Sequence, residues 1–341
     1  MIIEETTTYA YKLKYIENLS FDNIIELNKN LVPSYHSNPS LYNSLDRGKA
    51  VLTTEEQCCA YIAAYGGMHQ GKINEVLEKI AINDFKNTDI QIVDWGCGQG
   101  LATVCLFDFF KSRGIGLDSV KKVILIEPSE LALERAKIHV NAYLNADEKI
   151  TTLRKMLDDI DENDIASNQS LTIHLFSNIL DIPSIDLQLL ANKIRTNISG
   201  LHYFFCWGPL YSLNNRIDIF WNYFSEATDV FKNSHNKQEY NAQGQIIKEY
   251  NYTAQNRVFK VNGSECELIA VDYYLPKQFH AAYQLDAVRN VIQKQGNKEK
   301  IVGLYKNLSD FEIQTPFDIG ASIYEDVHPI LAVLNNIITR G

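Results

Sequence analysis

Short apolar runs alternate with amphipathic stretches through the middle of the chain. The apolar runs have the length of buried strands and cover residues 90–94, 123–126, 171–176 and 201–207, and residues 149–154 are expected to form a further strand, the third in chain order. The stretch after the second run places Leu133, Ala136, Val140 and Leu144 on one helical face. Strands that alternate with helices predict an α/β fold with a doubly wound, mostly parallel sheet.

Helical patterns also precede and follow this region. Before it, helices are expected over residues 21–31, 53–65 and 73–85, with a Pro/Asn/Ser-rich connector at 33–43 and a glycine-containing break at 65–72. After the fourth strand, a helix at 184–198 should face inward through Ile185, Leu189 and Ile194, and a second helix should span 217–231. The expected domains are a helical N-terminal cap (1–85), a core (86–275) and a C-terminal helical extension (276–341).

The end of the sheet is predicted from a hairpin pattern. Residues 232–254 are rich in Asn, Gln, Ser and Lys and are expected to form an exposed loop. Residues 257–261 and 265–274 alternate as strands, and Asn262-Gly263 between them is typical of a hairpin turn. These two strands would complete a seven-stranded sheet. Helices at 278–295 and 328–338 are expected in the C-terminal extension.

Three glycines follow the first strand directly, in the order Asp94-Trp-Gly-Cys-Gly-Gln-Gly. Gly96, Gly98 and Gly100 permit a tight turn against which a ligand can lie. The spacing differs from the G-x-G-x-x-G of dinucleotide sites, because Leu101 stands where the third glycine should come. The alternative is that the glycines only connect a strand to a helix.

The second strand ends in an acidic residue, Glu127, followed by Ser129 as a candidate N-cap. An acid at this place in nucleotide-binding α/β units accepts hydrogen bonds from ribose hydroxyls. With the glycine loop and Asp94, this arrangement resembles class I (Rossmann-like) S-adenosylmethionine-dependent methyltransferases over about residues 60–275. A fainter similarity is to mitochondrial small-subunit-associated methyltransferase-like proteins.

The resemblance implies S-adenosylmethionine as cofactor and gives site residues their expected roles. Asp94 would lie near the cationic methionine end, Glu127 would bind the ribose, and the three glycines would face the cofactor. Asp158, after the third strand, would contact adenine, although such acidic stretches are often solvated loops. No metal site is expected.

The acceptor pocket is expected between the N-terminal cap and the loops after strands four and five. Asn178 and Asp181 follow strand four, and Asp181 is a candidate base. Asn178 is also a candidate cofactor contact, and His69, with Tyr65 and Lys72, is a candidate from the segment before the first strand. Trp207, Tyr211 and Arg216 are candidate pocket walls. The alternatives are that Asn178 and Asp181 only form a turn, that His69 is solvated, and that the aromatic residues belong to the core.

Composition restricts the partners. The 341-residue chain has a net charge of −10 and six cysteines without metal-ligand or disulfide spacing. The N-terminus lacks a signal-peptide pattern and no stretch is long enough to span a membrane, so a cytoplasmic protein is expected. The acidic balance favours a small molecule or a protein side chain as methyl acceptor. RNA methylation and a catalytically inactive interaction module are the alternatives, and the oligomeric state is left open.

Overall fold

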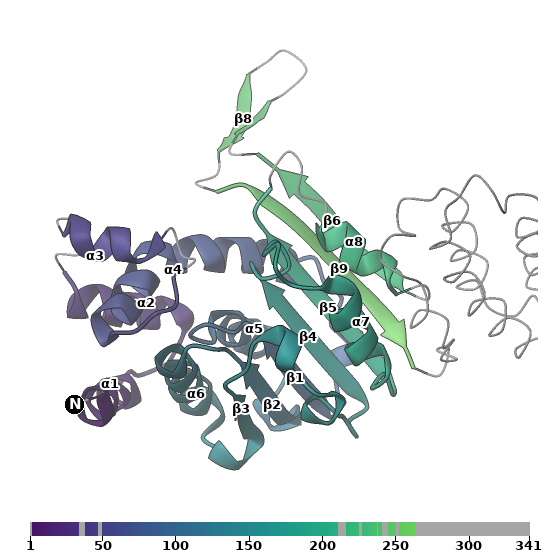
Figure 1. Ribbon diagram of the computed structural model, residues 1–341, viewed down its shortest axis with the longest axis horizontal. Coiled ribbons are helices and arrows are strands. Elements are labelled where there is room, and N and C mark those ends of the chain that lie inside the picture. Colours follow the sequence, from purple (N-terminus) through teal and green to yellow (C-terminus); the bar gives the residue numbers. More distant parts are fainter. Residues whose placement is uncertain are drawn as a thin grey trace, which may run out of the picture.

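A seven-stranded sheet with helices on both faces forms the body of the molecule (Figure 1). The computed structural model describes residues 2–33, 38–46, 50–210, 216–224, 227–236, 238–240, 245–249 and 252–263. The strands in spatial order are β3 (Ile150–Leu153), β2 (Val120–Ile126), β1 (Ile90–Trp95), β4 (Leu171–Ser177), β5 (Leu201–Gly208), β9 (Ala254–Asn262) and β6 (Thr228–His235). The strands from β3 to β5 are parallel, and β9 is antiparallel to both of its neighbours. The predicted α/β fold with a mostly parallel sheet is confirmed.

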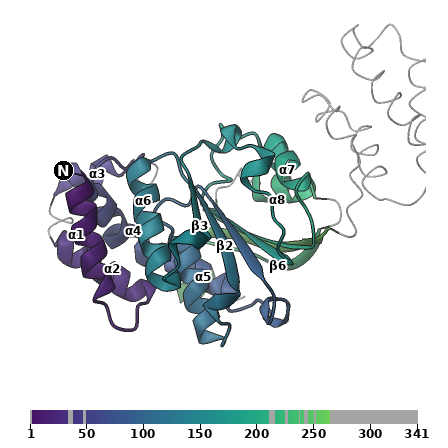
Figure 2. The ribbon, with the colours of Figure 1, turned by 90° about the horizontal axis from the view of Figure 1, so that it is seen from below.

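Helices cover the two faces unequally. The helices are α1 (Ile2–Lys14), α2 (Phe21–Leu31), α3 (Pro39–Ser44), α4 (Glu55–Leu77), α5 (Leu101–Ser112), α6 (Glu130–Leu144), α7 (Leu187–Arg195) and α8 (Arg216–Asn222). Figure 2 shows α1 to α6 gathered on one side of the sheet and α7 and α8 on the other. Successive side chains of a strand point to opposite faces of the sheet. Ile92 therefore packs in one core cluster and Val93 in the other.

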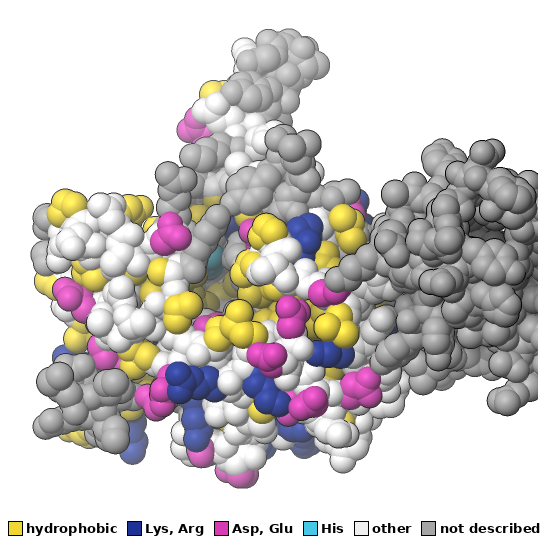
Figure 3. All heavy atoms as spheres, viewed as in Figure 1, with side chains coloured by type: hydrophobic (Ala, Val, Ile, Leu, Met, Phe, Trp, Pro, Cys, Tyr) yellow, Lys and Arg dark blue, Asp and Glu magenta, His cyan; other side chains and the backbone are white. Residues whose placement is uncertain are grey.

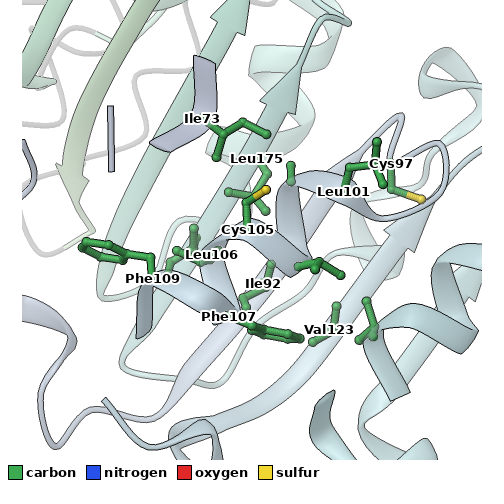
Figure 4. Packing of buried hydrophobic residues seen from close by; sticks show 14 of the residues in the cluster. Ile73, Ile92, Cys97, Leu101, Cys105, Leu106, Phe107, Phe109, Val123 and Leu175 are labelled. Atoms are coloured by element: carbon green, nitrogen blue, oxygen red, sulfur yellow. The ribbon is translucent and has the colours of Figure 1, made fainter. Parts of the chain in front are cut away.

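The larger core cluster joins the sheet to the helices before it. Figure 4 shows Ile73 of α4 beside Leu175 of β4, near side chains of α5. Tyr9 of α1 and Phe21 of α2 are buried in the same cluster. The N-terminal helices therefore share the core of the sheet, while the division into three domains remains a prediction.

The helix α4 corrects the predicted break at residues 65–72. It runs without interruption from Glu55 to Leu77. The predicted helix at 73–85 is therefore correct only as far as Leu77, and a 3-10 turn (Asn83–Phe85) follows. A Cβ at Gly66 would lie 3.0 Å from Cγ1 of Ile25, which shows that this glycine allows α2 to pack closely against α4. A glycine costs a helix about 1 kcal/mol, and burial of each large apolar side chain returns roughly 1.5–3 kcal/mol.

Other helix boundaries were predicted with mixed success. The helix at 21–31 is confirmed, with Ser20 and Asn23 forming a capping box, and Thr54 caps α4. The predicted connector at 33–43 is wrong in part because α3 begins at Pro39. The helix predicted at 184–198 is shorter, since Asp186 caps it, and Leu189 is exposed rather than inward-facing.

The end of the sheet differs from its prediction. The helix expected at 217–231 ends at Asn222, and residues from Thr228 form the strand β6. A bulge between Asp229 and Phe231 interrupts the strand alternation and accounts for the wrong prediction. The strand β9 contains residues 257–261 and pairs with β5 on one side and β6 on the other, whereas the predicted partner strand at 265–274 lies outside the described residues.

The predicted exposed loop contains a small ladder. The strands β7 (Gln238–Tyr240) and β8 (Ile246–Glu249) pair with each other and project from the body (Figure 1). The predicted elements at 265–274, 278–295 and 328–338 lie outside the described residues, as does Tyr211. Across the described ranges, no helix has the length and apolarity required to cross a membrane.

Candidate active site

The glycine loop between β1 and α5 is shaped by left-handed backbone conformations. Gly96, Gly98 and Gly100 have φ angles of +62°, +52° and +77°. A Cβ at Gly96 would lie 2.6 Å from Cδ1 of Ile179, and one at Gly100 would lie 3.2 Å from Cα of Ala136 in α6. A Cβ at Gly98 would meet no heavy atom of the described structure within 4 Å. Two glycines thus permit close packing, and the middle one borders open space.

Asp94, near the end of β1, has one carboxylate oxygen without a hydrogen-bond partner among the described residues. Its Oδ2 accepts a hydrogen bond from Thr103 Oγ1 at 2.7 Å, whereas the buried Oδ1 has no partner among the described residues. Burial and the nearby charge of Glu127 raise the pKa of Asp94 to about 7, although the hydrogen bonds with Thr103 lower it. An unpaired buried carboxylate oxygen is costly, so a cationic or hydrogen-bonding ligand would be stabilised here.

Glu127 lies at the end of β2, next to the loop. Its Oε2 accepts from the Gly98 amide at 3.1 Å and its Oε1 accepts from the Ser129 amide at 2.9 Å. Burial raises its pKa, and the two amide hydrogen bonds oppose that effect. Each carboxylate oxygen retains a lone pair for a further donor. Glu127 is therefore oriented by the backbone while remaining able to bind a hydroxyl.

These three features fit S-adenosylmethionine. The open space at Gly98 accommodates a ligand against the backbone, and the free lone pairs of Glu127 suit ribose hydroxyls. The unpartnered Oδ1 of Asp94 suits an ammonium group. The loop also lacks the glycine spacing of a dinucleotide site, as the sequence indicates.

A chain of hydrogen-bonded side chains connects α4 with the end of β4. Tyr61 Oη lies 3.1 Å from His69 Nε2, and His69 Nδ1 lies 3.1 Å from Asn178 Nδ2. Asn178 Oδ1 accepts from Lys72 Nζ at 3.3 Å. Burial and the nearby charge of Glu127 both raise the pKa of Tyr61. These hydrogen-bonded side chains therefore begin close to the candidate cofactor site. The structure thus brings together His69, Lys72 and Asn178 from two segments distant in sequence.

Asn178 has a backbone conformation that is unusual for a residue other than glycine. Its φ angle is +56°, and its backbone N–H donates to the backbone carbonyl of Trp207 in β5 at 2.8 Å. The following residue, Ile179, packs on Gly96 of the loop. Positive φ at a strand end is tolerated by Asn and is frequent at functional sites. The backbone at Asn178 and Ile179 therefore lies beside the glycine loop, while the side chain of Asn178 is held by Lys72 and His69.

The hydrogen bonds of His69 define its protonation. An amide nitrogen only donates, so Nδ1 accepts from Asn178 and the Nε2 proton points to Tyr61. Burial, together with the charge of Lys72, lowers the pKa of His69 to about 3. His69 is thus a neutral group with both ring nitrogens occupied, which suits orientation of Asn178 better than proton transfer.

The remaining predicted site residues lie at different depths. Asp181 has a buried Oδ1 without a partner in the described structure. Burial lowers the pKa values of Lys72 and Arg216, and the charge of Asp181 opposes this effect at both residues. Trp207 is buried, whereas Asp158 is exposed in a 3-10 turn, where its carbonyl accepts from Lys193. Arg216 donates to the carbonyls of Leu180 and Ile185 and so fixes the loop after β4.

The predictions missed a buried polar network behind the glycine loop. Arg135 of α6 donates to Glu55 at 2.7 Å, Asn28 at 2.7 Å and Gln99 at 3.3 Å, and its guanidinium lies 3.3 Å from the ring centroid of Tyr9. His139 Nδ1 lies 2.8 Å from the Gln99 carbonyl and its Nε2 lies 2.7 Å from Tyr9 Oη. Arg135 and His139 occupy the apolar face of α6 at i and i+4, and this spacing was the available sequence signal.

The surface agrees with a site between the N-terminal helices and the sheet. Figure 3 shows a hollow there with a histidine side chain visible in it, and interspersed acidic and basic side chains along the lower part of this face. Across the part of the chain that is described, no group of three or more His, Cys, Asp or Glu residues is placed to hold a metal ion.

Comparisons with known proteins concern the fold. No protein-family model matches the sequence, and no curated protein matches it. Magnesium protoporphyrin IX methyltransferase of Synechocystis PCC 6803, solved with S-adenosylhomocysteine, is 11% identical, with a TM-score of 0.39, over 68% of this chain and 99% of that one. TrmK of M. capricolum, also with S-adenosylhomocysteine, is 12% identical, with a TM-score of 0.34, over 78% and 96%. An S-adenosylmethionine-dependent O-methyltransferase of Thermotoga maritima is 14% identical, with a TM-score of 0.37, over 67% and 73%.

Such distant similarities do not define an activity, and the fold assignment rests on the molecule itself. The strand order β3-β2-β1-β4-β5-β9-β6, the antiparallel β9 and the glycine loop after β1 give the chain a class I methyltransferase-like fold. The resemblance derived from Asp94, the glycines and Glu127 is thereby supported by the position of these residues at one edge of the sheet.

Proposed function

We propose that the protein is an S-adenosylmethionine-dependent methyltransferase that acts on a small molecule or a protein side chain. The observation that carries this proposal is the combination of the open Gly98 backbone, the unpartnered Asp94 Oδ1 and the backbone-oriented Glu127 at one edge of the sheet. When bound, S-adenosylmethionine supplies an activated methyl group with a neutral thioether as leaving group.

The residues of this chain bind and orient. Asp94 would pair with the ammonium of the methionine end, Glu127 would accept from the ribose hydroxyls, and the glycine loop would lie against the cofactor. Asn178, held by His69 and Lys72, would face the acceptor beside the loop. Alignment of an acceptor with the methyl group supplies much of the rate enhancement in such a reaction, because the entropy of bringing two reactants together is already lost on binding.

The net charge of −10 favours a small or protein acceptor over RNA. The test is incubation of the protein and a cell extract with methyl-labelled S-adenosylmethionine, followed by mass spectrometry. Label in a metabolite or a protein supports the proposal, and label confined to RNA contradicts the proposed acceptor class. Absence of any labelled product above a protein-free control contradicts the catalytic role.

Gly98→Ala is expected to weaken S-adenosylhomocysteine binding at least tenfold, about 1.4 kcal/mol, because the new methyl group occupies ligand space. Gly114→Ala is a matched control: Gly114 has a φ of +69°, and a Cβ there also meets no heavy atom of the described residues within 4 Å. Both changes should cost about 1–2 kcal/mol of folding stability through backbone strain. Isothermal titration calorimetry and thermal unfolding separate the two effects, and equal ligand affinity of the two variants would contradict the placement of the cofactor at Gly98.

A further inference from the structure

Lys72 is a buried lysine with few groups to stabilise its charge. Its side chain lies on α4, is 4% exposed, and makes one hydrogen bond within the described structure, to Asn178 Oδ1. No carboxylate of the described residues lies within ion-pair distance of its Nζ, although the charge of Asp181 acts on it. An ammonium group has three protons to donate, and here it has one hydrogen-bond acceptor and the ring of Tyr252, whose centroid lies 5.7 Å from Nζ. Burial with so few partners shifts the protonation equilibrium toward the neutral amine.

The neutral amine has a chemical use at this position. One N–H donates to Asn178, and the nitrogen lone pair is left available for a proton. Lys72 is hydrogen-bonded to Asn178, and the next residue, Ile179, packs on Gly96 of the candidate cofactor loop. Lys72 therefore lies one hydrogen bond away from the edge of the sheet where the methyl group is expected. The hydrogen bonds of His69 to Asn178 and Tyr61 leave no ring nitrogen for the same task.

We propose that Lys72 is the catalytic base of the methyl transfer, and that the acceptor is therefore an O–H or N–H group rather than a carboxylate. This inference rests on the proposed function. As the acceptor atom forms its bond to the methyl carbon and the carbon–sulfur bond breaks toward sulfur, the proton of the acceptor passes to the lone pair of Lys72 Nζ. The amine becomes an ammonium and later loses this proton to solvent.

The groups around Lys72 agree with such a cycle. Burial lowers the pKa of Lys72 to about 8, and the carboxylate of Asp181 opposes this effect. The other titratable neighbours are the neutral His69, Glu75 on the same helix, and Tyr252, whose ring centroid lies 5.7 Å from Nζ. Glu75 is bound to Asn233 and Tyr252. A base is most effective when its pKa lies near the working pH, and Asp181 would stabilise the ammonium after proton transfer.

The first test measures the titration of Lys72 in the full chain. The protein is labelled with 13Cε-lysine, the Lys72 resonance is assigned with the Lys72→Met variant, and its chemical shift is followed by NMR from pH 6 to 11. Exposed Lys121 in the same spectrum is the reference lysine. A Lys72 midpoint near pH 8 is expected. A midpoint near the ordinary lysine value of about 10.4 would overturn the proposal, because the group would then be a permanent cation suited to an anionic acceptor.

The second test separates proton transfer from charge. Lys72→Met and Lys72→Arg are both expected to bind S-adenosylhomocysteine within about twofold of the wild type, and to transfer labelled methyl to the acceptors of a cell extract about 10²–10⁴-fold more slowly. Lys121→Arg should transfer at the wild-type rate. Full activity of Lys72→Arg would overturn the proposal, since arginine retains the charge but is not a base at neutral pH. Absence of S-adenosylhomocysteine binding to the wild type would instead reject the proposed function, and with it the role of Lys72, even if Lys72 titrates near pH 8.

Discussion

Replacement of Arg135 by methionine is expected to lower the free energy of unfolding by about 3–5 kcal/mol. Arg135 is fully buried and holds Glu55, Asn28 and the loop residue Gln99 through hydrogen bonds. Methionine fills much of the same volume but leaves a carboxylate and two amide oxygens without their donor. Urea unfolding followed by circular dichroism measures the change.

A surface pair provides the control for this variant. Arg154 also binds a carboxylate, Glu130, at 2.7 Å, but the two side chains are 59% and 64% exposed. Arg154→Met should therefore cost no more than about 1 kcal/mol. An Arg135→Met protein as stable as Arg154→Met would show that the N-terminal helices are not held to the loop by this network.

Glu127→Ala is expected to weaken S-adenosylhomocysteine binding by about 1–3 kcal/mol, roughly 5–150-fold, because a charge-assisted hydrogen-bond partner of the ribose is lost. The change also removes the acceptor that orients the Gly98 amide. Calorimetry at 25 °C measures the affinity, and thermal unfolding confirms that the variant is folded.

The neighbouring acid Glu130 is the matched control for Glu127. It lies three residues further on, is largely exposed, and pairs with Arg154 at the surface. Glu130→Ala should bind S-adenosylhomocysteine like the wild type. If Glu127→Ala and Glu130→Ala had the same affinity, Glu127 would have no part in the cofactor site.

The network around Arg135 changes the expected role of the N-terminal helices. Tyr9 and Asn28 belong to α1 and α2, and both are buried against Arg135. Gln99, between the second and third loop glycines, donates to the Cys58 carbonyl of α4. The N-terminal helices therefore support the glycine loop from behind, in addition to contributing His69 and Lys72 at the strand ends.

The parts of the fold that were predicted correctly depend on local signals. The strand β1 and its loop combine β-branched residues with alternating glycines, and the predicted N-cap Ser129 begins α6. Asp94 and Glu127 follow from their places at strand ends, since parallel strands bring their carboxyl ends to one edge. Such features involve few residues close in sequence and are independent of distant packing.

The wrong predictions involve contacts between distant segments. The glycines of α4 indicate a break locally, but Ile25 of α2 packs on Gly66 and keeps the helix continuous. The strand β6 is stabilised by pairing with β9, which no local pattern near Val230 indicates. The hydrogen bond between Lys72 and Asn178 likewise joins residues that are 106 positions apart, and no local pattern indicates it. Hydrophobic periodicity identifies a face but not the partner that covers it.

Binding of S-adenosylmethionine at the glycine loop is tested by calorimetry of the 341-residue chain. At pH 8, above the Asp94 pKa of about 7, this carboxylate is ionised and able to pair with the ammonium of the ligand. Saturable binding of S-adenosylmethionine and S-adenosylhomocysteine is expected, with no detectable heat from NAD at the same concentration. Binding of NAD more tightly than either of these ligands, or no binding of S-adenosylhomocysteine, would contradict it.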